Sequence, residues 1–222
     1  MAKARLRLPL VIVNFKAYEQ AVGKRAVKLA KICERVAKAT KKSIAVAVQA
    51  ADLCCVACAV SIPVLAQHVD TVSLGAHTGA VLPEAVKQAG AVGSLLNHSE
   101  KRLDLKTIKA AIKRLHELGM TAVVCANTPA LAAKIAKLKP DIIAIEPPEL
   151  IGGKIAVSQA KPEVITKTTS KVRIPVLCGA GVHTADDVAK ARKLGAKGVL
   201  VASGVAKAKN PEKVLMGLLL SL

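Results

Sequence analysis

Aromatic side chains are almost absent from this chain: of its 222 residues, one is Phe, one is Tyr and none is Trp. The stacking platforms that single-stranded nucleic-acid sites need are therefore missing. Acidic residues are also scarce, since 15 Asp and Glu stand against 34 Lys and Arg and leave a net charge of +19. Such a charge attracts polyanions and steers small anionic substrates toward the protein. Most lysines fall inside helical patterns, which indicates solvated helix faces and no specific nucleic-acid partner.

Long apolar runs are missing at both ends of the chain. Asn14 and Lys16 interrupt the apolar N-terminal segment before it could act as a signal peptide. The C-terminal "LMGLLLSL" is too short to cross a bilayer. We therefore expect a soluble, cytoplasmic protein with no membrane partner.

The six cysteines form no disulfide framework that fits a chain of this length, and without a secretory signal they indicate a reducing compartment. Cys55 and Cys58 have the spacing of half a zinc site, but a matching second pair is absent. We expect all six to be small apolar core residues, and no metal site is predicted.

Eight apolar runs rich in Val, Ile, Leu and Ala alternate with segments of helical periodicity. Most of the runs show no polar alternation, which is typical of strands buried on both faces of a parallel sheet. The predicted strands are 8–15, 43–48, 62–67, 92–97, 121–127, 141–146, 174–179 and 198–203. The predicted helices are 22–40, 51–60, 83–88, 104–118, 129–138, 162–170, 184–194 and 211–220.

Several of these helices have recognisable ends. Thr128, Thr184 and Asn210 supply cap residues before a proline or an acidic first turn. Gly119 and Gly195 close helices just before the next strand. Eight βα units without a linker predict an α/β fold, a single (β/α)8 barrel domain over residues 1–222. A doubly wound open sheet is the alternative, and the count of eight favours the barrel.

Polar residues gather where the predicted strands end, and in a barrel those ends form the mouth that carries the chemistry. Period-two alternation places Asn14 and Lys16 on one face at the end of the first strand. The fourth strand ends at His98, where the next two residues indicate the start of a charged helix, and the sixth strand ends at Glu146. The seventh and eighth run into "CGAGV" and "VASGV", small-residue turns whose backbone N–H groups predict an anion site.

Six motifs follow the predicted strands in order: "NFK", "GAHTG", "NHSEKR", "IEPPELIGGK", "CGAGV" and "LVASGVAKAKNP". Together they resemble the triosephosphate isomerases of the short archaeal type, and the resemblance covers nearly the whole chain. It implies a (β/α)8 barrel that interconverts dihydroxyacetone phosphate and glyceraldehyde 3-phosphate through an enediolate, in glycolysis and gluconeogenesis, without a cofactor.

The resemblance implies a role for each polar residue at the mouth. Glu146 would be the base that moves a proton between adjacent substrate carbons, and His98 would be a neutral electrophile at the positive end of a helix. Lys16 would supply positive charge to the transition state and the phosphate, and Asn14 would position the substrate and the lysine. Glu149 is the rival base, but the family motif places the base directly before the first proline. The resemblance also implies two supporting residues that do not touch the substrate, Ser99 and Glu100. Glu100 would be the partner that holds Lys16.

The resemblance also implies a phosphate site and a lid. The lid, residues 147–157, would close over the intermediate and exclude water. The usual short archaeal lid carries Gly-Thr-Gly followed two residues later by proline, so Gly153, Lys154 and Ala156 depart from it. This departure suggests a loosened lid and poor turnover, and the scarcity of aromatic residues with the excess of Ala, Lys and Cys suggests an engineered or composition-biased chain. The implied lid residues include Pro147, Pro148, Ile151, Gly153 and Lys154. The implied phosphate-binding amides lie near Gly152, Gly181, Ala202 and Ser203.

The "GAHTG" loop resembles the one that reaches into a neighbouring subunit's site in this family. His77 lies in this loop, and Thr78 would be nearest to the partner's Asn14. The resemblance therefore implies a homo-oligomer, with a dimer of dimers as the usual short archaeal form.

Two other classes of function stay open on the sequence alone. Another phosphate-binding barrel, such as an epimerase or a lyase, would share the small-residue turns without requiring all four polar residues at the mouth. A non-enzymatic binder of polyanions would use the net charge and would weaken steeply with added salt.

Overall fold

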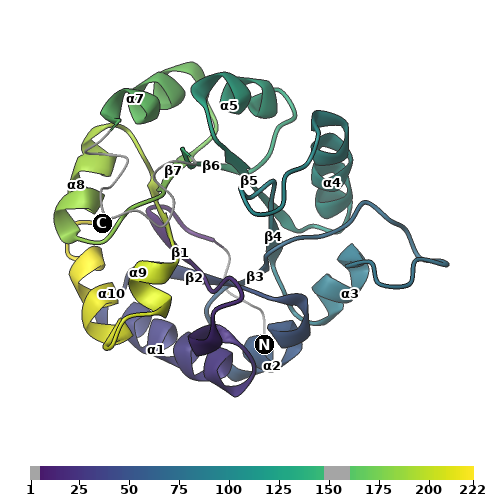
Figure 1. Ribbon diagram of the computed structural model, residues 1–222, viewed down its shortest axis with the longest axis horizontal. Helices are drawn as coiled ribbons and strands as arrows, with labels where there is room; N and C mark the ends of the chain where they lie inside the picture. The colour runs from purple at the N-terminus through teal and green to yellow at the C-terminus, as the bar shows by residue number, and fades with distance from the viewer. Residues whose placement is uncertain (1–5, 148–160) are drawn as a thin grey trace.

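The structure is a computed structural model that describes residues 6–147 and 161–222. Within them, eight parallel strands pair in chain order, and β8 also pairs with β1, so the sheet closes into a barrel (Figure 1). The predicted barrel is confirmed and the open sheet is excluded. The strands are β1 Leu10–Asn14, β2 Ser43–Val48, β3 Val64–Ala66, β4 Gly93–Leu96, β5 Thr121–Ala126, β6 Ile142–Ile145, β7 Val176–Gly179 and β8 Gly198–Val201.

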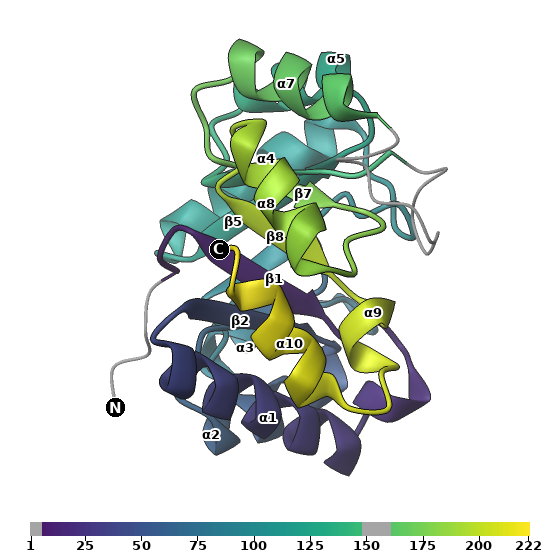
Figure 2. The ribbon, with the colours of Figure 1, turned by 90° about the vertical axis from the view of Figure 1, so that its left-hand side faces the viewer.

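Helices surround the barrel on its outside (Figures 1 and 2). The eight predicted helices all occur, and among residues 6–147 and 161–222 the sequence analysis missed two 3-10 turns, η1 and η2, and the short helix α9. The helices are η1 Glu19–Ala21, α1 Lys24–Thr40, η2 Ala50–Asp52, α2 Leu53–Ala59, α3 Pro83–Gln88, α4 Leu105–Glu117, α5 Pro129–Ala136, α7 Pro162–Lys171, α8 Ala185–Lys193, α9 Ser203–Ala206 and α10 Pro211–Leu219.

The strands are buried on both faces because successive side chains point alternately inward and outward. In β1, Leu10 and Ile12 belong to the apolar cluster inside the barrel, whereas Val11 and Val13 belong to the layer between barrel and helices. This alternation explains why the strands lack a polar face in the sequence, as predicted.

The predicted helix ends are confirmed by their hydrogen bonds. The side chains of Thr128, Thr184 and Asn210 each accept a hydrogen bond from the backbone N–H three residues later. Gly119 and Gly195 have φ of 67° and 96°, the left-handed conformation that a glycine adopts without steric cost.

The prediction of a helix start directly after His98 was wrong. Ser99 and Glu100 form a turn, and α4 begins only at Leu105, where the Asp104 side chain accepts a hydrogen bond from Thr107 N–H. A dipole of α4 therefore does not act on His98, because such effects fade within the first turn of a helix.

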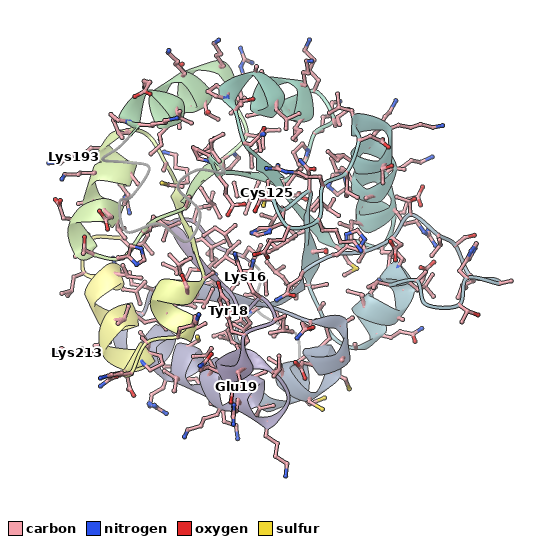
Figure 3. The ribbon with its side chains drawn as sticks, viewed as in Figure 1. Lys16, Tyr18, Glu19, Cys125, Lys193 and Lys213 are labelled. Carbon is pink, nitrogen blue, oxygen red and sulfur yellow. The ribbon has the colours of Figure 1, made fainter. Side chains whose placement is uncertain are left out.

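The prediction that all six cysteines are core residues was also wrong. Cys33, Cys125 and Cys178 are buried, but the three cysteines of α2 are exposed. The lysine-rich helix faces follow the expectation: Lys193 and Lys213 lie on the outer rim, whereas Lys16 lies toward the centre of the ring (Figure 3).

Candidate active site

The polar residues predicted at the strand ends come together in one pocket at the barrel mouth. Asn14 ends β1, Lys16 follows two residues later, His98 follows β4, and Glu146 directly follows β6. All four line the pocket, because the carboxyl ends of parallel strands meet at one end of a barrel. The predicted phosphate residues Gly181, Ala202 and Ser203 line the same pocket.

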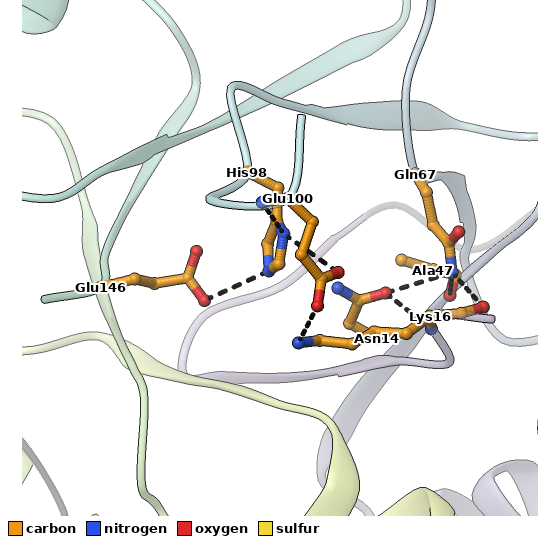
Figure 4. A network of polar contacts seen from close by, with 7 residues as sticks. All are labelled: Asn14, Lys16, Ala47, Gln67, His98, Glu100 and Glu146. Carbon is orange, nitrogen blue, oxygen red and sulfur yellow. Dashed lines mark hydrogen bonds and ion pairs between the residues drawn. The ribbon is translucent and has the colours of Figure 1, made fainter. Parts of the chain in front are cut away.

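The orientation of the His98 ring is set by the turn that follows it. Glu100 N–H donates to His98 Nδ1 over 3.2 Å (Figure 4). A nitrogen that accepts from an amide carries no proton, so the neutral ring has its hydrogen on Nε2. That nitrogen faces Glu146, with 3.7 Å between Nε2 and Oε1. The imidazole is 7% exposed and presents one N–H donor to the pocket.

Glu146 is a buried carboxylate at the end of β6, 5% exposed. Its backbone N–H donates to Ala126 O of β5, which fixes the position of its Cα. Its Oε2 has no hydrogen-bond partner among the described residues. A buried, unpaired carboxylate oxygen is costly, and such groups cluster at sites whose partner is the substrate.

The room for Glu146 comes from Gly179, the last residue of β7. A Cβ built on Gly179 would lie 2.4 Å from Glu146 Cγ and 2.9 Å from its Oε1. The carboxylate therefore occupies the volume that any side chain at position 179 would need.

Lys16 points into the pocket from a strained backbone. Its φ is 49°, which is uncommon for a residue with a Cβ and is found mostly where the surroundings impose it. Lys16 N–H donates to Asn14 Oδ1 over 3.0 Å, and Lys16 Nζ lies 2.8 Å from Glu100 Oε1. The lysine side chain is 11% exposed, so its charge is held close to the pocket with a partly solvated partner. This is the supporting contact that the resemblance implied for Glu100.

Gln67, directly after β3, is a functional candidate that the sequence analysis missed. Its Nε2 lies 3.2 Å from Asn14 Oδ1, 3.0 Å from Lys16 O and 3.3 Å from Ala47 O (Figure 4). One amide group thereby ties the strained Lys16 backbone to β2 and to the Asn14 side chain. A polar residue at the end of an apolar run was the signal that could have found it.

Asn97 is a second missed residue. It has φ of 58°, and its Nδ2 donates to Cys125 O over 2.9 Å while its Oδ1 accepts from Leu103 N–H over 2.9 Å. The side chain thus ties the turn that carries His98 to β5 on one side and to the approach of α4 on the other.

The wall opposite His98 consists of small residues from the β7 and β8 ends. Ala180 and Gly181 both have positive φ, 75° and 68°, a backbone shape in which successive N–H groups can form an anion-binding concavity. His183, which the sequence analysis did not use, also lines the pocket. A Cβ on Gly204 would lie 2.9 Å from His183 Nδ1, so α9 packs closely against the loop after β7.

Cys125 lies beneath Glu146 inside the barrel. Burial raises the pKa of its thiol well above the ordinary value, and the neighbouring Glu146 carboxylate raises that pKa further. The thiol therefore stays protonated beside the carboxylate and is a poor nucleophile.

Several predicted residues do not lie at this pocket. Pro147 is described and buried next to Glu146, whereas the rest of the predicted lid lies outside the described residues. His77 and Thr78 lie in an exposed loop before α3 that projects from the barrel (Figure 1). The predictions outside the described residues are those for Pro148, Glu149, Ile151, Gly152, Gly153, Lys154 and Ala156.

No three His, Cys, Asp or Glu side chains in the described part of the chain are grouped as a metal site. None of the helices there is long and apolar enough to cross a bilayer.

The barrel mouth holds a buried carboxylate, an imidazole and a lysine, beside a wall whose backbone can bind an anion. These are the features of an enzyme that transfers protons on a small anionic substrate. The family model for triosephosphate isomerase matches residues 9–218. The chain is 51% identical over 215 residues to a triosephosphate isomerase from Methanothermobacter thermautotrophicus, covering 95% of this chain and 94% of the relative. It is 50% identical over 215 residues to one from Methanobacterium bryantii, covering 95% of both chains.

The chain belongs to the triosephosphate isomerase family. It is accordingly an isomerase that interconverts dihydroxyacetone phosphate and glyceraldehyde 3-phosphate, a reaction of glycolysis. The resemblance noted in the sequence is confirmed, and the epimerase or lyase alternative is not favoured.

Proposed function

We propose that Glu146 is the base of this isomerisation and that His98 is its electrophile. The observation that carries the assignment is the facing pair at the mouth: His98 Nε2 and Glu146 Oε1 are 3.7 Å apart, with the Lys16 ammonium beside them in the same pocket. A substrate with a carbonyl next to a hydroxyl-bearing carbon would place its reacting carbons by Glu146 and its oxygens by His98.

The proposed reaction moves one proton between two carbons and one between their oxygens, and it leaves the enzyme unchanged. Glu146 takes a proton from the carbon next to the carbonyl, and the electron pair of that C–H bond forms the enediolate double bond. His98 Nε2–H donates a hydrogen bond to the oxygen on which charge develops, and Lys16 stabilises that charge electrostatically. Glu146 then returns the proton to the adjacent carbon, while the hydroxyl proton passes from its own oxygen to the former carbonyl oxygen beside His98 Nε2.

Asn14, Glu100 and Gln67 would act through Lys16, not on the substrate's carbons. Asn14 and Gln67 hold the strained Lys16 backbone, and Glu100 holds its ammonium. A fixed ammonium costs no reorganisation when charge develops in the transition state. Ser99 would serve only as part of the turn that orients His98.

The substrate phosphate would bind at the wall formed by the β7 and β8 ends. The positive φ of Ala180 and Gly181 and the position of Ala202 and Ser203 at the start of α9 support this assignment. In this proposal Gly152 supplies a further amide, and residues 147–157, with Pro147 and Pro148 at their start, close over the substrate as a lid.

We further propose that the protein is a cytoplasmic homo-oligomer of the archaeal type, a dimer of dimers. Two features support an interface at the loop that contains His77 and Thr78. This loop is exposed, and its Leu74 is 74% exposed, a large apolar side chain that a monomer leaves in water. The similar proteins reported above come from archaea. Sizing by light scattering tests this proposal, and a monomer at micromolar concentration would refute it.

The experiment that tests the catalytic assignment compares Glu146→Gln with the wild type in a coupled assay of glyceraldehyde 3-phosphate isomerisation. The substitution keeps the side-chain shape and removes the base, so kcat should fall by roughly 10³-fold or more, within the range for loss of a general base and of its charge. Glu163→Gln, an exposed carboxylate at the start of α7, is the matched control and should retain wild-type activity. A Glu146→Gln enzyme with kcat within tenfold of the wild type would refute the assignment.

A further inference from the structure

Helix α2 presents three cysteines to solvent that the isomerase site does not use. Leu53, Val56 and Ala57 form the buried face of this helix, whereas Cys54, Cys55 and Cys58 are exposed. The helix lies on the outside of the barrel, between α1 and α3 (Figure 1). The other three cysteines are buried in separate elements, Cys33 in α1, Cys125 in β5 and Cys178 in β7. Only on α2 are accessible thiols brought together.

The spacing of Cys55 and Cys58 suits a disulfide within one helical turn. A rise of 1.5 Å per residue on a cylinder of radius 2.3 Å places Cα atoms three residues apart at about 5.0 Å. Disulfides span Cα separations of roughly 4.4–6.8 Å. Cys54 and Cys58, four residues apart, would be at about 6.2 Å by the same helix geometry. Cys55 is therefore the nearer partner of Cys58.

Closing this bridge strains the helix. Side chains three residues apart have Cβ atoms roughly 5–6 Å apart. A disulfide needs about 3.8 Å between its Cβ atoms, so the Cβ atoms of Cys55 and Cys58 must move closer by roughly one to two ångströms, which distorts the last turn of α2. Strained disulfides are more easily reduced, which makes such a bridge a reversible one.

The surroundings of α2 allow that distortion. The helix has seven residues, and Val60 after it is already extended, with φ of −136° and ψ of 156°. Ser61, just beyond, is anchored to α1 because its backbone N–H donates to Glu34 Oε1 over 2.7 Å. The turn that carries Cys58 can therefore unwind locally without releasing the following strand β3.

We propose that Cys55 and Cys58 are a reversible dithiol–disulfide pair, oxidised by a small organic disulfide. One of the two thiolates attacks the small disulfide, forms a mixed disulfide and releases one thiol. The second protein thiolate then attacks the protein sulfur of the mixed disulfide and releases the second thiol. The protein loses two protons and two electrons, and the small disulfide gains both to become two thiols.

The test is intact mass spectrometry of the full chain after incubation with oxidised glutathione, followed by peptide mapping without reductant. The wild type should lose two hydrogen atoms, the map should contain a Cys55–Cys58 crosslink, and dithiothreitol should reverse both. Cys54→Ser is the matched control on the same helix face and should still form the Cys55–Cys58 disulfide. Cys55→Ser and Cys58→Ser should stop at a mixed disulfide.

Three outcomes would overturn the proposal: a wild type that stops at mixed disulfides, a crosslink between Cys54 and Cys58, or covalent dimers. Circular dichroism of each variant, together with its isomerase activity, verifies that the fold is intact. None of these mass measurements depends on the catalytic roles of Glu146 and His98.

Discussion

Replacing Gly179 by alanine should displace the Glu146 carboxylate, the proposed base, without altering the proposed phosphate-binding wall. An added Cβ would lie 2.4 Å from Glu146 Cγ. Carbon atoms in contact lie about 3.5–4.0 Å apart, so the two groups must separate by roughly 1.1–1.6 Å. Because Cγ is near the backbone end of the side chain, rotation of the carboxylate alone cannot relieve the clash. Gly179 does not have a positive φ, so its backbone conformation suits alanine and the clash with Glu146 is the only strain expected.

A misplacement of ~1 Å in a reacting group costs on the order of 10²-fold in rate. That factor corresponds to about 2.7 kcal/mol of activation free energy. We therefore expect kcat of Gly179→Ala to fall by roughly 10²-fold. KM should change little, because the proposed phosphate contacts of Gly181, Ala202 and Ser203 are untouched. Overpacking should also lower the free energy of unfolding, by about 1–3 kcal/mol.

The assay is steady-state isomerisation in both directions, combined with thermal unfolding of the same protein. Gly217→Ala is the matched control, because a Cβ at that position in α10 meets no atom within 4 Å. It should keep full activity and gain up to about 1 kcal/mol of stability from helix propensity. If the free energy of unfolding of Gly179→Ala falls by the expected amount but its kcat stays within threefold of the wild type, the position of Glu146 does not govern the rate and the reasoning fails.

Three further predictions concern side chains around the barrel. Gln67→Leu keeps the volume but removes the donor that holds Lys16, so kcat should fall at least tenfold with KM less affected; equal losses of activity and folded fraction would contradict a positioning role. Burial opposes ionisation of Asp70, yet a backbone N–H and His68 hydrogen-bond to it and hold its pKa below the ordinary value. The stabilisation that ionised Asp70 provides is therefore present above about pH 4 and is lost as pH falls through the lowered pKa. The free energies of unfolding of Asp70→Asn and the wild type, measured with urea, should therefore become equal in acid; a difference that stays constant with pH would refute this. Burial raises the pKa of the Cys33 thiol to about 12 and also raises the pKa of the Cys125 thiol. A thiol reagent at pH 8 should therefore label the α2 cysteines first. Rapid labelling of Cys33 in the native protein would contradict its burial.

The strands and helices could be predicted because local physics decides them. Apolar runs without polar alternation suit only a parallel sheet covered on both faces, and eight of them in alternation with helices leave few closed arrangements. Thr184 shows how local the signals are, since its capping box with Asp187 forms within four residues. Where the local signal was weak, as after His98, the prediction of a helix was wrong, because a turn closed by Glu100 N–H took its place.

The sequence by itself determined the barrel and the order in which Asn14, Lys16, His98 and Glu146 reach its mouth, because the carboxyl ends of parallel strands meet at one end of a barrel. Only the tertiary structure decided how these groups are held. Gln67, Asn97 and Gly179 act on residues far away in the chain, through contacts that exist only once the barrel has closed. The same holds for the α2 thiols, which composition assigned to the core and which the packing of Leu53 and Val56 turned toward solvent.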